Sequence, residues 1–461
     1  MTTVGGSGPG EPTVSPRAGR AMAVDAEAVD ACPRAEPGRI AEMLRAIAEI
    51  GADGEGSVSR LAFTSAERNA HDLVAGWLRD LGLAVRQDAI GNTIAERRGR
   101  RTDLPAIAVG SHLDSVPRGG RFDGIVGVVG AVELVRLLAE REAEIDHPVR
   151  VVCFAGEEGA RFGEPCIGSK AVTGMLERRD LRLMHDTEGV SLAAALSGVG
   201  LDPAKVSEAR WEPAEWAAFL ELHVEQGRVL EAAGRQIGLV DVVSGSTRLR
   251  LTVSGRADHS GGTPMGLRAD ALAAAAEIIL AAEALASDER HRGTRTTVGY
   301  LRVHPNSITT IPGRVTFTVD VRDIDTDRQR QVAAEVVARA RQICERRATS
   351  LEVSLIADTS PAVLPVWIRD FTSGACADLG IEYLVLTSGA SHDAQVVNRR
   401  VPAGMIFVPS RDGLSHVPEE WTSSADIARG VDVLTESVLR LDRFLGSVAS
   451  LGDEAGSEIA R

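Results

Sequence analysis

The sequence predicts an α/β protein that is interrupted by an inserted α+β domain. Residues 104–109 form an apolar, strand-like run, and residues 125–138 behind them have the apolar content of a helix. Between about residues 246 and 361 the strand candidates alternate apolar with polar positions, as in an antiparallel sheet with one covered face. After Pro361 predicted helices and strands alternate again, as they do before residue 246. These three observations indicate one α/β domain that is built from two segments of the chain.

The first elements of the α/β domain precede residue 104. Apolar residues with helical spacing extend from residue 39 to residue 50 and stop at Gly51, a residue suited to a helix C-cap. A second helix is expected over residues 65–80. The strand-like segments 83–85 and 91–95 follow, and we expect them to form a hairpin.

The loop at residues 110–124, with the sequence GSHLDSVPRGGRFDG, is the first candidate site. It follows a predicted strand and precedes a predicted helix, which is where open α/β sheets place their functional groups. His112 could ligate a metal ion, Asp114 could hold the other ring nitrogen of that histidine, and Asp123 could supply a carboxylate to one or two ions. Taken alone, a His-x-Asp pair is more often a hydrogen-bonded surface pair, so further ligands are needed.

Further candidate ligands follow two later strands. The predicted strand at 149–155 ends in Gly-Glu-Glu-Gly, which contains Glu157 and Glu158. One of these carboxylates could bind a metal ion while the other takes a proton from the attacking water. His223 ends the alternating run at 219–224. An acidic turn or a structural histidine would explain each motif separately, whereas their shared position at strand ends favours a metal site.

The insertion is predicted to combine an antiparallel four-stranded sheet with two helices. The strand candidates are residues 247–253, 296–303, 315–320 and 350–356, and the helices are residues 268–286 and 327–347. Three polar positions in this region have no evident structural purpose: His259, Asn306 and Arg322.

Two more loops with polar residues lie after the insertion. A helix at 366–379 and a strand at 381–386 lead to the segment Ser388–Ala394, which contains Gly389, Ala390 and His392. A strand at 405–408 leads to the loop 413–420, which contains His416, and a final helix is expected over residues 424–445. His416 is therefore another candidate ligand at a strand end.

Composition limits the possible partners. The 461 residues include 51 Lys and Arg against 65 Asp and Glu, which gives a formal net charge of −14. This charge disfavours a nucleic-acid or anionic-membrane partner, although a local basic pocket could still bind a small acid. The sequence has no apolar run of 18 residues, and its five cysteines include no C-x-x-C pair. We therefore expect a cytoplasmic protein without disulfides.

The predicted boundaries follow from these segments. Residues 1–37 are rich in Gly, Pro, Ala and Ser and are expected to form a disordered tail. The α/β domain is expected to comprise residues 38–245 and 362–447, the inserted α+β domain residues 246–361, and a flexible C-terminal tail residues 448–461.

The motifs together resemble the metal-dependent amidohydrolase branch of the M20 peptidase family. This branch contains N-carbamoyl-L-amino acid hydrolases, β-ureidopropionases and allantoate amidohydrolases. The resemblance covers residues 39–445 in the family's order and is carried by residues 110–124, 156–162, 223–227, 258–265, 319–323, 388–394 and 413–420. It implies that residues 38–245 and 362–447 form a zinc-exopeptidase-like catalytic domain that binds two metal ions, with a mixed sheet and helices on both faces. It also implies that residues 246–361 form a lid or dimerisation domain, and that the protein is a homodimer that acts on a small ureido acid.

The resemblance also implies roles for individual residues. The metal ligands would be His112 and His223 for one divalent ion, His416 and Glu158 for the other, with Asp123 bridging the two. The ions could be zinc, manganese, cobalt or nickel.

The remaining implied roles concern catalysis and substrate binding. Glu157 would be the general base, Asp114 would support the centre, and His259 from the other subunit would stabilise the oxyanion. The substrate would be bound by Gln226 at its ureido group, by Asn306 and Arg322 at its carboxylate, and by the loop residues Gly389, Ala390 and His392.

The leading functional hypothesis is the hydrolysis of N-carbamoyl-L-amino acids. Allantoate amidohydrolase activity is the nearest alternative, because it uses the same machinery on a diureido acid. β-Ureidopropionase, aminoacylase or exopeptidase activity is less favoured, since related peptidases usually have a carboxylate where this chain has His223. A binding protein without catalysis is disfavoured because Glu157 and all five ligand positions are present.

Overall fold

The structure of the protein, a computed structural model, describes the backbone of residues 33–459 and the side chains of residues 33–447. The predicted N-terminal tail therefore lies mostly outside the described residues, and Pro37 already begins a helix. From Arg34 onward the described chain belongs to one compact unit.

Nine strands form the larger sheet, in the order β1-β2-β4-β3-β5-β16-β6-β14, with β15 beside β6. β3 is parallel to β4 and β5, and β16 is parallel to β5. β2 is antiparallel to β4, and β6 is antiparallel to β16. The sheet is therefore mixed, as predicted, and β1 with β2 forms the predicted hairpin. The strand bounds are β1 (Ala84–Gln87), β2 (Thr93–Arg97), β3 (Ala106–His112), β4 (Val149–Phe154), β5 (Trp216–Val224), β6 (Ile237–Val243), β14 (Ala362–Val363), β15 (Tyr383–Ser388) and β16 (Ala403–Val408).

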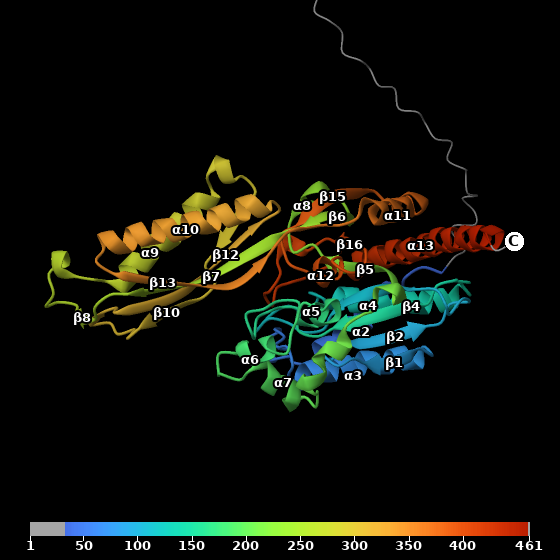
Figure 1. Ribbon diagram of the computed structural model, residues 1–461, viewed down its shortest axis with the longest axis horizontal. Helices are drawn as coiled ribbons and strands as arrows, with labels where there is room; N and C mark the ends of the chain where they lie inside the picture. The colour runs from blue at the N-terminus through green and yellow to red at the C-terminus, as the bar shows by residue number, and fades with distance from the viewer. Residues whose placement is uncertain (1–32, 460–461) are drawn as a thin grey trace, which may run out of the picture. The chain divides into compact units, whose positions relative to one another are not determined.

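Helices cover both faces of this sheet (Figure 1). In β3, Ile107 and Val109 join a core with one set of helices, and Ala108 between them joins a second core with another set. The first set comprises α2 (Pro37–Ala48), α3 (Ser65–Asp80), α4 (Ile125–Glu140), α11 (Val366–Asp378) and α13 (Ser424–Ile459). The second set comprises α5 (Ile167–Thr173), α8 (Val229–Ala233) and α12 (Asp393–Val397). The predicted fold class is confirmed.

The last helix is longer than predicted. α13 continues to Ile459, whereas the sequence analysis ended it near residue 445 and expected a separate tail from residue 448. The sequence has no proline after residue 445 that would interrupt the helix, so the helical hydrogen bonds continue without a break.

The insertion contains a five-stranded antiparallel sheet, in the order β10-β12-β7-β13, with β9 also paired to β12. Its strands are β7 (Gly245–Ser254), β9 (Arg295–Thr297), β10 (Leu301–His304), β12 (Arg314–Asp323) and β13 (Ser350–Thr359). The helices α9 (Ala271–Ala286) and α10 (Thr326–Arg346) pack against one face, through a core that includes Leu251, Phe317 and Val319 (Figure 1).

The larger sheet of the insertion has five strands, one more than the four that were predicted. The single strand expected at 296–303 is divided into β9 and β10, which pair with different parts of β12. Gly299 lies at the break, and a glycine weakens the interior of a strand because it has no side chain to pack.

Several shorter elements complete the described chain. β8 (Asp258–His259) pairs with β11 (Thr310–Ile311) in a two-stranded sheet. The sequence analysis made no prediction for most of residues 160–215, which form α5, α6 (Asp180–Leu183), α7 (Leu192–Gly198) and the 3-10 turns Pro203–Ala209 and Pro213–Glu215. The other 3-10 turns are Met265–Leu267, Glu289–His291 and Arg411–Gly413. Among the described residues, every helix is too short or too polar to cross a membrane.

Candidate metal centre

The predicted ligands converge at one edge of the larger sheet. β3 ends at His112, and β5 carries His223 one residue before its end. Glu157 and Glu158 follow β4, and His416 lies in the loop after β16. These four strands are parallel neighbours, so their carboxyl ends lie at the same edge.

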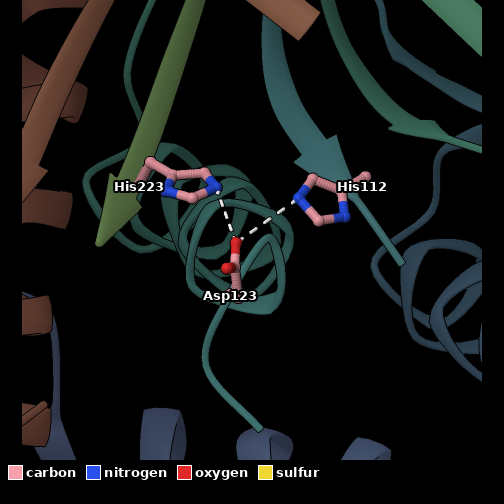
Figure 2. Close-up of side chains that lie close together, drawn as sticks. All are labelled: His112, Asp123 and His223. Atoms are coloured by element: carbon pink, nitrogen blue, oxygen red, sulfur yellow. Dashed lines mark ion pairs between the residues drawn. The ribbon is translucent and has the colours of Figure 1, made fainter. Parts of the chain in front are cut away.

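Asp123 lies at the centre of this convergence, at the start of α4. Its Oδ1 atom is 3.2 Å from His223 Nε2 and 3.7 Å from His112 Nε2. Figure 2 shows both histidine rings directed toward this carboxylate. Its Oδ2 atom is 3.3 Å from His416 Nε2, which in turn is 3.1 Å from Glu158 Oε2. Two groups of possible metal ligands therefore share one carboxylate, and they are grouped as the sequence analysis expected.

The donor set fits divalent metal ions. The Nδ1 atom of His223 is 2.9 Å from the carbonyl oxygen of Val224, and a carbonyl can only accept, so Nδ1 carries the proton. In neutral His223 the unprotonated Nε2 then faces the Asp123 carboxylate, and this buried Nε2 has no hydrogen-bond partner among the described residues. Two lone pairs that face each other repel unless a cation lies between them. Imidazole nitrogens with carboxylate oxygens suit zinc, manganese, cobalt or nickel.

Charges in the centre also favour bound cations. Burial alone would raise the pKa of Asp123, but contacts with His112, His223 and His416 hold that pKa well below its usual value. Burial lowers the pKa of His416, but Asp123 and Glu158 outweigh this effect and raise it to about 11. The carboxylates therefore attract positive charge, which a metal ion would supply in place of protons.

Glu157 has the environment expected of a general base. Burial, with the nearby carboxylates of Glu158 and Asp114, raises its pKa to about 7, although His112 acts in the opposite direction. Its Oε2 atom is 3.8 Å from His112 Nε2, and its Oε1 atom accepts a hydrogen bond from the thiol of Cys166 at 3.1 Å. A carboxylate with a pKa near neutrality can take up and release a proton during one catalytic cycle.

Asp114 contacts more of the centre than the sequence analysis expected. Its Oδ1 atom lies 3.4 Å from Nδ1 of His112, which is the predicted supporting contact. Its two carboxylate oxygens also accept hydrogen bonds from the backbone N–H groups of Glu157, at 2.8 Å, and Glu158, at 3.0 Å. One buried side chain thus orients a ligand from β3 and the loop after β4.

The sequence analysis missed three side chains that support the centre. The Ser415 hydroxyl lies 2.7 Å from Asp123 Oδ2 and 2.9 Å from Glu420 Oε1, while Glu420 Oε2 accepts hydrogen bonds from the backbone N–H groups of Phe122 and Asp123. Glu221 forms a buried group with His223 and His392. Glu221 is an acidic residue in a strand with apolar neighbours, and that signal could have identified it.

A cavity of about 1250 Å³ lies beside the centre. Its lining includes five residues from the predicted site: Gln226, Arg322, Gly389, Ala390 and His416. The Nε2 atom of Gln226 donates to Asp123 Oδ2 at 2.6 Å, and its buried Oε1 atom has no partner among the described residues. Arg322 donates from Nη1 to the carbonyl oxygen of Gly389 at 3.0 Å.

His392 does not reach this cavity. Its Nε2 atom is 2.8 Å from the Ser388 hydroxyl, and its ring packs edge-on against His223 with centroids 4.5 Å apart. Burial holds the pKa of His392 well below its usual value. The loop after β15 turns this ring into the protein, and the expected contact of His392 with substrate stays a prediction.

His259 and Asn306 also lie away from the cavity within this chain. Exposed His259 pairs with Thr310 between β8 and β11, and Asn306 follows β10. β10 ends at His304, whose partner Arg314 is at the opposite end of β12 from Arg322. At 3.3 Å per residue, this separation along β12 is about 26 Å. The structure therefore does not bring Asn306 and Arg322 together in one subunit.

Comparison with known proteins gives consistent matches over most of the chain. The sequence pattern of peptidase family M20/M25/M40 matches residues 108–440. The N-carbamoyl-L-amino acid amidohydrolase of Geobacillus stearothermophilus is 42% identical over 404 residues, covering 87% of this chain and 98% of that protein. The allantoate amidohydrolase of Bacillus subtilis (strain 168) is 33% identical, covering 87% and 97%. The crystal structure of an amidase of the hydantoinase/carbamoylase family from Burkholderia vietnamiensis has a TM-score of 0.83 at 33% identity, covering 89% and 98%.

The chain therefore belongs to peptidase family M20/M25/M40, which is metal-dependent, and the groups around Asp123 are those that could bind metal. Within the family it belongs to the amidohydrolase branch, and it is a hydrolase of the N-carbamoyl amino acid amidohydrolase type. The resemblance identified in the sequence is confirmed.

Proposed function

We propose that this protein hydrolyses the carbamoyl C–N bond of N-carbamoyl-L-amino acids and releases the amino acid, ammonia and carbon dioxide. The observation that carries this proposal is the shared carboxylate of Asp123, which joins two possible metal sites within reach of Glu157. The relative from Geobacillus stearothermophilus, at 42% identity, carries this activity in its name and supports the choice.

The proposed centre holds two divalent ions. His112, Asp123 and His223 would bind one ion, and Asp123, Glu158 and His416 would bind the other. When bound, such ions acidify water and polarise a carbonyl oxygen, which makes the carbamoyl carbon easier to attack. Asp114 would keep His112 in the orientation required of a ligand, through the contact at its Nδ1 atom.

Glu157 would move the protons of the reaction. It takes a proton from the attacking water as that water adds to the carbamoyl carbon. It then delivers this proton to the departing nitrogen as the C–N bond breaks, and ammonia leaves. The remaining carbamate breaks down to the amino acid and carbon dioxide. Burial raises the pKa of Glu157, which favours uptake of the proton in the first step.

Substrate binding would use the cavity beside the centre. Arg322 offers a planar guanidinium for a bidentate grip on the substrate carboxylate, and Gln226 lies beside the position of the ureido group. The loop with Gly389 and Ala390 would contact the substrate through its backbone.

We also propose that the protein acts as a homodimer. His259 of the partner subunit would stabilise the oxyanion and Asn306 of the partner subunit would contact the substrate carboxylate, because neither residue lines the cavity of its own chain. The cytoplasmic location expected from the cysteines stays a prediction, and the four described cysteines are free.

Hydrolysis of allantoate is the second candidate, since a relative with that name is 33% identical over most of its length. The test is ammonia release by metal-loaded protein from L- and D-N-carbamoyl amino acids, N-carbamoyl-β-alanine and allantoate, with a dipeptide as control. Preference for L-carbamoyl amino acids supports the first proposal. Preference for allantoate supports the second candidate, hydrolysis of allantoate. Activity on the dipeptide alone contradicts both candidates.

A further inference from the structure

One wall of the substrate cavity is rich in arginine. Five arginines from the sheet of the insertion line it: Arg248 and Arg250 on β7, Arg295 on β9, Arg302 on β10 and Arg322 on β12. In β7 and β12 the alternate residues are buried in the core beneath α9 and α10, so the arginines of these strands share the opposite face. The chain has a net charge of −14, and this basic wall is a local basic pocket of the kind that the sequence analysis allowed for.

Only part of this charge is neutralised within the protein. Asp320 forms ion pairs with both Arg322, at 3.1 Å, and Arg248, at 3.4 Å. The guanidinium groups of Arg250, Arg295 and Arg302 form no ion pair or hydrogen bond with any other residue whose side chain the structure describes, and all three residues are exposed. The cavity therefore presents guanidinium groups that are free to bind anions from solution.

Arg295 is the free arginine closest to the proposed substrate position. It lies directly opposite Arg322 in the pairing of β9 with β12, and like charges at such positions repel unless an anion lies between them. A Cβ atom on Gly389 would lie 3.0 Å from Nη1 of Arg295, so this guanidinium rests against the loop that also receives the hydrogen bond from Arg322. Two guanidinium groups therefore approach Gly389 together.

We propose that Arg295 binds a second carboxylate of the substrate, so that the preferred substrates are N-carbamoyl derivatives of acidic L-amino acids. This inference rests on the proposed function, in which Arg322 holds the α-carboxylate. In the carbamoyl derivatives of aspartate and glutamate, only two or three carbon atoms separate the carboxylates, a spacing that suits arginines on opposite positions of adjacent strands. Arg250 and Arg302 add positive potential along the same wall.

The experiment compares N-carbamoyl-L-glutamate with N-carbamoyl-L-glutamine, which has nearly the same size but no second charge. The kcat/KM of each is measured with metal-loaded wild-type protein and with the Arg295→Gln variant in a low-salt buffer. Calorimetry with the Glu157→Gln variant, alone and combined with Arg295→Gln, gives the two affinities without turnover. The Arg292→Gln variant is the matched control, because Arg292 is exposed, close in sequence and outside the cavity.

We expect wild-type protein to favour the glutamate derivative by at least about tenfold in kcat/KM, and the Glu157→Gln variant to favour it similarly in affinity. Arg295→Gln should reduce both ratios to within about twofold of unity, whereas Arg292→Gln should preserve them. Equal use of the two ligands by wild-type protein, or an unchanged ratio in Arg295→Gln, would overturn the proposal. Tighter binding of the glutamate derivative without turnover of either compound would instead refute the proposed function and leave the anion site in place.

Discussion

Replacement of Asp114 by asparagine tests how the centre is held together. The buried carboxylate accepts hydrogen bonds from the backbone N–H groups of Glu157 and Glu158 and lies 3.4 Å from Nδ1 of His112. An asparagine has one acceptor oxygen, so at least one of these three donors loses its partner. A buried donor without a partner costs about 1–3 kcal/mol, and loss of such a supporting contact lowers metal affinity by about 10- to 100-fold.

Competition with a chelator measures the metal affinity of the Asp114→Asn variant, and ammonia release measures its kcat. The Asp103→Asn variant makes the same change of charge at an exposed position and should match wild-type protein. Metal affinity and kcat within twofold of wild type in Asp114→Asn would contradict the assigned role, because the backbone of the β4 loop would then be held by other contacts.

Three further predictions concern the base, the dimer and pH. Glu157→Gln should lower kcat by at least about 100-fold while metal content, measured by elemental analysis, is retained; loss of metal would instead make Glu157 a ligand. His259→Ala should abolish turnover with metal intact, and mixing it with inactive Glu157→Gln protein should restore activity only if His259 acts in the partner's site. Burial raises the pKa of Asp442, but hydrogen bonds from His147 outweigh this and lower it, so the carboxylate stabilises the fold above a pH of about 4. Asp442→Asn should therefore lower the Tm by about 1–3 °C at pH 7, and the difference should shrink as the pH falls through the lowered pKa; a constant difference would contradict this.

The candidate metal centre was largely predictable from the sequence because its candidate ligands lie near the ends of parallel strands. His112, Glu158, His223 and His416 each lie at, next to or after the end of a strand, and the carboxyl ends of parallel strands share one edge of the sheet. The grouping around Asp123 came from the family resemblance, and the distances agree with it.

Other parts of the site depend on geometry that residue patterns do not contain. The loop after β15 carries His392 in a polar segment, but only the direction of the chain decides that the ring packs against His223. His259 and Arg322 belong to the same predicted domain, yet they are separated by the length of β12 because β8 lies beyond one end of that strand.

The basic wall of the cavity could be predicted from the sequence only in part. The alternation in β7 and β12 predicts which of their residues share a face, so the common orientation of Arg248, Arg250 and Arg322 follows from sequence. The approach of Arg295 to Gly389 does not, because it depends on the break at Gly299 that separates β9 from β10.

The central claim is that Asp123 joins two metal sites beside Glu157. Anomalous diffraction from crystals of the metal-loaded protein tests it most directly. The account predicts two anomalous peaks per subunit, one between Asp123, His112 and His223 and the other between Asp123, Glu158 and His416. A single peak that lies away from Asp123, or the absence of a peak at both positions in active protein, would contradict it.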